Sequence, residues 1–273
     1  MAVRGKLIAQ ISATQIDQAV ALRPDLVTIS AGGNDVIRPG SDPDQVSQQF
    51  EDMIVRLSAT GATVVASIWG RGVDDYRRAA EQLAAAPAGV VAVEVNLSCP
   101  NLEGRRGIFA HDADLSAEVI RVTSAAGRPR WAKLSPNTDR VVEVATAVRD
   151  AGAEAVTLVN TLLGMVLDPA TGRPALAAGG GGYSGRGIHP VAVRAVFDTH
   201  VAHPDLPIIG VGGVASGWDA AEFMLAGASA VSSVSATSRT VESTKRRPGS
   251  VRSTRRACWI SRLRGTSAEE MAS

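Results

Sequence analysis

The chain has 273 residues, of which 45% are hydrophobic, and its formal net charge is only +1. This length suits a single α/β barrel domain, for which about 250 residues is typical. A net charge so close to zero argues against a polyanionic partner for the whole molecule. Its two cysteines, Cys99 and Cys258, argue against a disulfide scaffold and for a reducing cytoplasm. No apolar stretch approaches the roughly 20 residues that span a bilayer, and residues 1–10 lack a secretory signal core, so we expect neither a membrane protein nor an exported one.

The first 61 residues predict a helix, a strand and a second helix. Apolar residues recur at helical spacing as far as Leu22, and Pro24 ends this helix because it disfavours helical conformation in the residue before it. The β-branched run 26–30 follows as a strand. Asp42-Pro43-Asp44 starts the next helix, with proline near its first position, and Gly61 closes it.

From residue 63 onward, strand and helix alternate along the chain. The predicted strands are 63–68, 90–97, 131–134, 155–159, 207–211 and 230–234. The predicted helices are 73–85, 115–126, 139–151, 190–199 and 218–226. The strands are short and apolar, as expected when helices cover both faces of a sheet. Such alternation predicts an α/β fold with a parallel sheet, whose functional groups belong at the carboxyl ends of the strands.

One stretch at a predicted strand end combines a thiol with two carboxamides: Val95-Asn96-Leu97-Ser98-Cys99-Pro100-Asn101. Asparagine side chains donate and accept hydrogen bonds at once, so the two carboxamides suit a flat, amide-like substrate edge. The proline fixes φ and stiffens the turn that presents the thiol. The alternative interpretation is an Asx-type turn with a buried, inert cysteine.

Further motifs follow in order after this stretch. They are Trp131-Ala132-Lys133-Leu134-Ser135-Pro136-Asn137, Leu158-Val159-Asn160-Thr161, Gly180-Gly181-Gly182-Tyr183-Ser184-Gly185 and Ile209-Gly210-Val211-Gly212-Gly213-Val214. Together, over about residues 64–231, they resemble dihydroorotate dehydrogenase, the FMN enzyme of pyrimidine synthesis. Cysteine in the Ser-Cys-Pro-Asn element resembles the soluble class 1 enzymes, since the membrane-associated class has serine there. The resemblance implies a (β/α)8 TIM-type barrel, which this chain would form incompletely.

The resemblance also implies roles for individual residues. Dihydroorotate would be oxidised to orotate, with Cys99 as the base and Lys133 beside the N1/O2 edge of the flavin, where negative charge develops on reduction. A lysine that merely extends to solvent is the alternative for Lys133. The implied substrate-binding residues are Asn96, Asn101, Asn160 and Thr161. The implied FMN-binding residues are Ser67, Asn96, Lys133, Val159, Gly185, Gly212 and Gly213, and no metal is implied.

Partners and location follow from the same resemblance. The electron acceptor would be fumarate, or NAD through a partner iron–sulfur flavoprotein, and we expect a homo-oligomer. A cytoplasmic protein is expected, with no membrane contact.

The two ends of the chain depart from this pattern. Residues 1–61 lack the family's first strands, and Gly32-Gly33-Asn34-Asp35 resembles a fragment of an SGNH-type esterase, with Asn34 in an oxyanion hole. The nucleophile and base of such an esterase are missing, so we expect no hydrolase activity. Val234-Ser235 replaces the second half of the phosphate clamp, where a valine side chain would obstruct the anion. These departures put normal dehydrogenase activity in doubt.

Residues 239–264 form a basic, serine-rich run in which Glu242 is the single acid. Such a terminus is typical of a solvated, disordered tail, and nucleic-acid binding through phosphate contacts is the less favoured alternative. The expected organisation is therefore an esterase-like fragment at 1–62, a barrel portion at 63–235 and a basic tail at 236–273.

Overall fold

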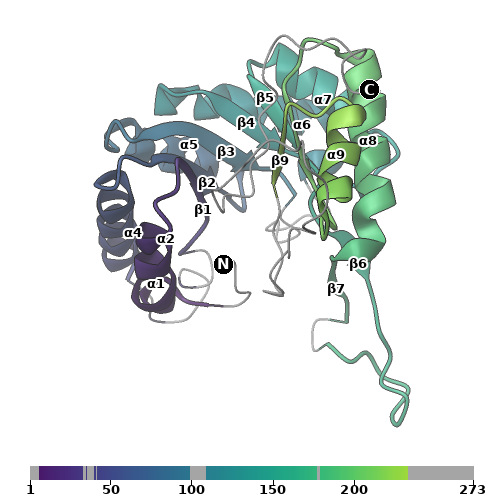
Figure 1. The fold of residues 1–273 in the computed structure, drawn as a ribbon, viewed down its shortest axis with the longest axis horizontal. Coiled ribbons are helices and arrows are strands. Elements are labelled where there is room, and N and C mark those ends of the chain that lie inside the picture. The colour runs from purple at the N-terminus through teal and green to yellow at the C-terminus, as the bar shows by residue number, and fades with distance from the viewer. Residues whose placement is uncertain are drawn as a thin grey trace, which may run out of the picture.

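A computed structural model describes residues 6–32, 35, 40, 42–98, 109–176 and 179–232. Its main sheet has seven parallel strands in the order β1-β2-β3-β4-β5-β8-β9. They are β1 Leu26–Ile29, β2 Thr63–Ile68, β3 Val90–Asn96, β4 Arg130–Lys133, β5 Ala155–Leu158, β8 Ile208–Val211 and β9 Ala230–Ser232. The sheet curls and the helices lie on its convex side, so the molecule is half of a β/α barrel (Figure 1). The predicted incomplete TIM-type barrel is confirmed.

Helices connect successive strands of the sheet. They are α4 Pro43–Ser58, α5 Val73–Ala84, α6 Ala113–Val122, α7 Val141–Asp150, α8 His189–Ala202 and α9 Gly217–Leu225. Short 3-10 turns lie on both sides of α6, at Phe109–His111 and Thr123–Ala126, and another precedes α8 at Arg186–Ile188. The predicted N-terminal helix is present as α1 Ile8–Ile11 and α2 Asp17–Ala21, joined by a π-helical turn at Ser12–Ile16. None of the helices in the described ranges is long and apolar enough to cross a lipid bilayer.

The two faces of the curved sheet differ because successive side chains of a strand point to opposite sides. The convex-facing side chains are apolar, fully buried and packed under the helices, among them Val64, Val93, Val95, Ala132, Val156 and Ile208. The concave face carries polar side chains at the centre of the sheet, a feature that the apolar strand pattern did not predict. The main hydrophobic core therefore lies between sheet and helices, and the concave side carries polar groups beside a small apolar cluster of Ala155, Ile209 and Val211.

The strand from the N-terminal segment completes one edge of this sheet. β1 pairs in parallel with β2, with Leu26 opposite Thr63 and Ile29 opposite Ala66. The strand predicted at residues 26–30 is therefore present, as β1. The segment therefore belongs to the same sheet as the barrel portion.

A small antiparallel hairpin was not predicted from the sequence. β6 Leu162–Gly164 pairs with β7 Gly181–Tyr183, and the chain between them projects away from the half-barrel (Figure 1). Apolar side chains are exposed along it, with Val166 at 69%. The sequence pattern did not predict the hairpin because its second strand consists mainly of glycine, which is rare in strands.

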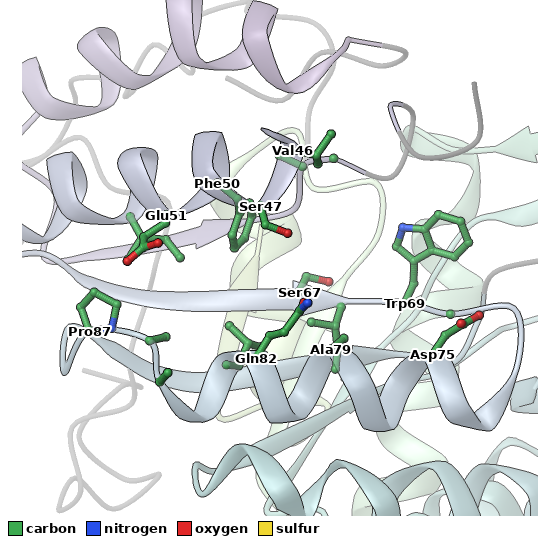
Figure 2. A pocket seen from close by; sticks show the side chains of 18 of the residues that line it. Val46, Ser47, Phe50, Glu51, Ser67, Trp69, Asp75, Ala79, Gln82 and Pro87 are labelled. Carbon is green, nitrogen blue, oxygen red and sulfur yellow. The ribbon is translucent and has the colours of Figure 1, made fainter. Parts of the chain in front are cut away.

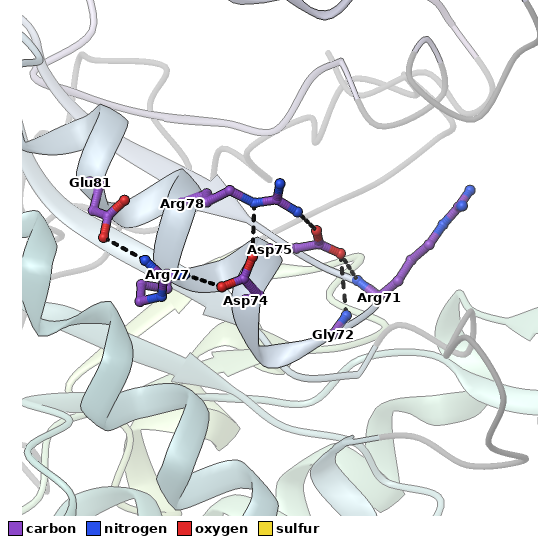
Figure 3. A network of polar contacts seen from close by, with 7 residues as sticks. All are labelled: Arg71, Gly72, Asp74, Asp75, Arg77, Arg78 and Glu81. Carbon is purple, nitrogen blue, oxygen red and sulfur yellow. Dashed lines mark hydrogen bonds and ion pairs between the residues drawn. The ribbon is translucent and has the colours of Figure 1, made fainter.

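A network of charges fixes the start of α5 (Figure 3). Asp75 Oδ2 accepts from the backbone N–H of Arg71 at 2.9 Å and of Gly72 at 3.2 Å, and Arg78 Nη2 donates to Asp75 Oδ1 at 2.7 Å. Burial alone would raise the pKa of the Asp75 carboxyl. The hydrogen bonds from Arg71, Arg78 and Gly72, together with the Arg78 charge, outweigh burial and hold this pKa below its usual value.

The lowered pKa of Asp75 makes its contribution to stability depend on pH. A carboxyl whose pKa is lower in the folded state stabilises above its unfolded pKa, and this stability is lost as pH falls through the folded pKa. We expect Asp75→Asn to lower the free energy of unfolding at pH 7 by about 0.5–1 kcal/mol, because solvent screens this partly exposed group. The difference from the wild type should shrink in urea titrations at progressively acidic pH. Asp44→Asn, at an exposed carboxyl in α4, is the control, and a pH-independent difference for Asp75→Asn would contradict the account.

Candidate active site

The carboxylate of Glu94 connects the polar side chains of the concave face. Glu94 Oε1 accepts from Ser67 Oγ on β2 at 3.0 Å, and Oε2 accepts from Thr157 Oγ1 on β5 at 3.1 Å. The ammonium of Lys133 on β4 lies 3.5 Å from Oε1, and the two side chains of this ion pair are only 15% and 21% exposed. One carboxylate thus joins side chains from four neighbouring strands and holds the lysine amine inside the curve of the sheet.

Sequence reasoning did not single out Glu94. A usable signal was present, because residues two apart in a strand share a face and Glu94 lies two before Asn96. The register places Asn96 opposite Lys133, and Lys133 opposite Thr157. These groups therefore share the concave face near the carboxyl ends of their strands.

Two of the predicted carboxamides meet beside this ion pair. Asn160 Nδ2 donates to Asn96 Oδ1 at 3.4 Å, and Asn160 Oδ1 accepts from the backbone N–H of Thr161 at 2.8 Å. Asn96 Oδ1 also accepts from the Ser98 N–H at 3.1 Å, and Ser98 Oγ donates to the Lys133 carbonyl at 3.1 Å. The structure thus fixes the chain up to Ser98. The predicted base Cys99 and the predicted carboxamide Asn101 lie outside the described residues.

The predicted glycines form a second cluster at the same edge of the sheet. A Cβ on Gly213 would lie 2.7 Å from the Gly185 carbonyl oxygen, so the two loops touch, and Gly213 has a φ of +67° that favours glycine. Val159, directly after β5, donates its N–H to the Val211 carbonyl at 2.9 Å. This bond connects the strand end that carries Asn160 with the strand end that carries Gly212. The amine, the amides and the glycine loops therefore occupy neighbouring strand ends.

The chemistry of this donor set suits an anion and a flat polar ring. Among the described residues, the N–H groups of Gly212 and Gly213 have no hydrogen-bond acceptor. Unpaired backbone N–H groups on side-chain-free residues can approach an anion closely. The lysine amine and the carboxamides supply a cation, donors and acceptors a few residues away. No group of three potential metal-binding side chains occurs in the described ranges.

A separate cavity of about 590 Å³ lies between α4 and α5 (Figure 2). Apolar side chains from both helices line it, including Phe50, Ile54 and Leu83, and it extends to Trp69 after β2. Of the predicted residues it contains only Ser67, whose hydroxyl bonds to Glu94. The candidate active site is the concave face, where the cation, the carboxamides and the two N–H groups without an acceptor in the described part of the chain gather.

A half-barrel with polar groups at its carboxyl edge defines the class: a protein of the β/α-barrel type. The sequence model of the family "Dihydroorotate dehydrogenase" matches residues 13–245. The chain is 45% identical over 183 residues to "Dihydroorotate dehydrogenase B (NAD(+)), catalytic subunit" of Bacillus pumilus, covering 67% of this chain and 58% of the relative. The same-named subunit of Geobacter sp. is 43% identical over 183 residues, covering 67% and 59%.

A solved structure agrees with the fold. The DHODH of Eimeria tenella in complex with ferulenol superposes with a TM-score of 0.53 at 21% identity, covering 69% of this chain and 57% of that one. The chain belongs to the dihydroorotate dehydrogenase family.

The relatives extend beyond the matched part. The chain spans 58% of the Bacillus pumilus subunit and 59% of the Geobacter subunit. The family match runs through residues 22–36, so the esterase interpretation of that stretch is not supported. Its key residue Asn34 and the basic run 239–264 lie outside the described residues.

The ion pair on the concave face can be tested by a double-mutant cycle. We expect Glu94→Gln and Lys133→Met to be coupled by about 1–2 kcal/mol in the free energy of unfolding, because each change leaves a partly buried charge unpaired. The control is the more exposed pair Arg194–Asp198 on α8, with side chains 76% and 33% exposed, for which Arg194→Met and Asp198→Asn should couple by less than about 0.5 kcal/mol. Equal coupling in the two cycles would show that burial of the Glu94 pair has no energetic effect.

Proposed function

We propose that the chain oxidises dihydroorotate to orotate with FMN, as a class 1 dihydroorotate dehydrogenase of pyrimidine biosynthesis. The observation that carries this proposal is that Lys133, Asn96 and Asn160 lie on one concave face beside the Gly212–Gly213 loop. Family membership supports the reaction class, and the residue types support its chemistry.

The residues present fit FMN. The N–H groups of Gly212 and Gly213, which have no acceptor among the described residues, would bind its phosphate, with Gly185 and Val159 beside them. The Lys133 amine would lie at the ring edge that becomes negative on reduction, while Asn96 and Ser67 complete the contacts. When bound, FMN supplies the acceptor for the hydride that leaves the substrate.

The chain's own groups would hold the substrate and take its proton. Asn96 Nδ2 has no acceptor in the described part of the chain, so it can donate to a ring carbonyl or carboxylate. Asn160, Thr161 and Asn101 would complete the grip, and a wrong ring would leave these amides unpaired. The Cys99 thiolate would take the proton from one ring carbon as the neighbouring carbon loses hydride, forming the C=C bond of orotate. The bonds that fix Ser98 also fix where the Cys99 loop begins.

The partners of the reaction are part of the proposal. The relatives are named as NAD(+)-linked catalytic subunits, which supports an electron-transfer subunit as partner rather than fumarate. A homo-oligomer in the cytoplasm is proposed with it. Because Val234-Ser235 stands where the resemblance implies a glycine-type clamp, we expect weaker FMN binding and slower turnover than in a full-length relative.

The proposal predicts separate effects on binding and on reaction. Purified protein titrated with FMN should show a saturable shift of the flavin absorption bands, and anaerobic dihydroorotate should bleach them. Cys99→Ser should leave FMN affinity unchanged and slow the bleaching by about 100-fold or more, because a serine hydroxyl is a far weaker base at neutral pH. Cys258→Ser is the matched control and should behave as the wild type. Undiminished bleaching in Cys99→Ser, or no flavin binding at all, would refute the proposed function.

A further inference from the structure

His189 is buried between the glycine loop and α9. Its Nδ1 lies 2.9 Å from the Gly212 carbonyl oxygen, and its Nε2 lies 3.0 Å from Glu222 Oε2. The ring of Phe223 packs edge-on against it, with centroids 5.0 Å apart and planes at 88°. The imidazole side chain is only 11% exposed. None of the sequence motifs pointed to this residue, and it directly contacts the loop proposed to bind phosphate.

The two partners of His189 are both hydrogen-bond acceptors. A carbonyl oxygen and a carboxylate accept hydrogen bonds, so a ring that donates from both nitrogens satisfies both partners. The charged groups that face it are Glu222 and Asp219, both from α9. Burial would raise the pKa of the Asp219 carboxyl, but hydrogen bonds from Ala215 and Ser216, and the charge of His189, lower it below its usual value. The β8 side contributes only the carbonyl, and Arg186 of the preceding turn is exposed.

The bond to Gly212 also orients the loop. The Gly212–Gly213 peptide is trans, and in a trans peptide the C=O and the following N–H point in opposite directions. With the Gly212 carbonyl held against His189, the Gly213 N–H points away from α8 and α9. That N–H is one of the two loop donors without an acceptor in the described ranges. Gly212, at a φ of +142°, adopts a conformation that other residues avoid, so the loop depends on contacts such as this one.

We propose that His189, charged and held by Glu222, is a positioning residue for the phosphate of the ligand. It fixes the Gly212–Gly213 peptide so that the Gly213 N–H donates to a phosphate monoester, and its positive charge lies directly behind the loop. The identity of the ligand as FMN rests on the proposed function. The clamp itself rests on the His189 geometry.

The experiment compares FMN with riboflavin, which has the same ring and lacks the phosphate. We expect His189→Gln to lower the preference for FMN over riboflavin by about tenfold, because one charge-assisted bond and the loop orientation are lost. The affinity for riboflavin should not change. Glu222→Gln, at a more exposed position, should also lower the preference for FMN over riboflavin. It replaces His189→Gln as the test variant if His189→Gln does not fold. His203→Gln, at the far end of α8, is the matched histidine control and should keep the wild-type preference.

The comparison of the two flavins separates positioning from a purely structural role. A merely structural loss in His189→Gln would lower the affinities for FMN and riboflavin together, whereas loss of the clamp lowers only the affinity for FMN. The proposal would be overturned if His189→Gln and Glu222→Gln both kept the wild-type preference for FMN over riboflavin. It would also be overturned if the affinity for riboflavin fell in parallel with the affinity for FMN.

A second measurement keeps this test independent of flavin binding. If the wild type binds neither flavin, the proposed function fails, and inorganic phosphate then becomes the probe. Saturable NMR shifts of the Gly212 and Gly213 amide signals with phosphate, absent in His189→Gln, would still support the clamp. No shift in the wild type would overturn it as well.

Discussion

The ion pair between Glu94 and Lys133 fixes the positions of the polar groups on the concave face of this half-barrel. A carboxylate and an ammonium that are each mostly withdrawn from water are tolerated only when they face one another and their remaining positions are hydrogen-bonded. Ser67 and Thr157 supply those bonds from the strands on either side. The amine is consequently held at a fixed height on the sheet, level with the carboxamide of Asn96 on the adjacent strand.

The positions of the other side chains follow because successive residues of a strand point to opposite faces of the sheet. Convex side chains are apolar and pack under helices, so the core can be stable while the opposite face keeps its polar groups. Each strand then delivers its polar residues to the same carboxyl edge, and the Val159–Val211 bond aligns the amide-bearing strand end with the glycine loop. Glu222 holds the His189 ring, and the ring in turn contacts the Gly212 carbonyl and fixes the glycine loop. The groups proposed to bind the ring and those proposed to bind the anion are thus placed by separate interactions around one sheet.

Much of this architecture could be predicted from the sequence. The site residues that could not be predicted were missed for one common reason. The strand–helix alternation and the motif residues Lys133 and Asn160 were accessible because strand ends of a parallel sheet gather at one edge. Glu94 and His189 were missed because their roles depend on partners distant in sequence: Thr157 lies 63 residues from Glu94, and Glu222 lies 33 from His189. Periodicity tells which face a side chain occupies, and not which group it meets there. The roles of Cys99 and Asn101, outside the described residues, remain predictions.

The most direct measurement is a crystal structure of the protein grown with FMN. The account predicts the flavin ring against Lys133 and Asn96 on the concave face, with its phosphate at the Gly212–Gly213 loop. Flavin in the cavity between α4 and α5 instead, with the concave face empty, would contradict the assignment of the site.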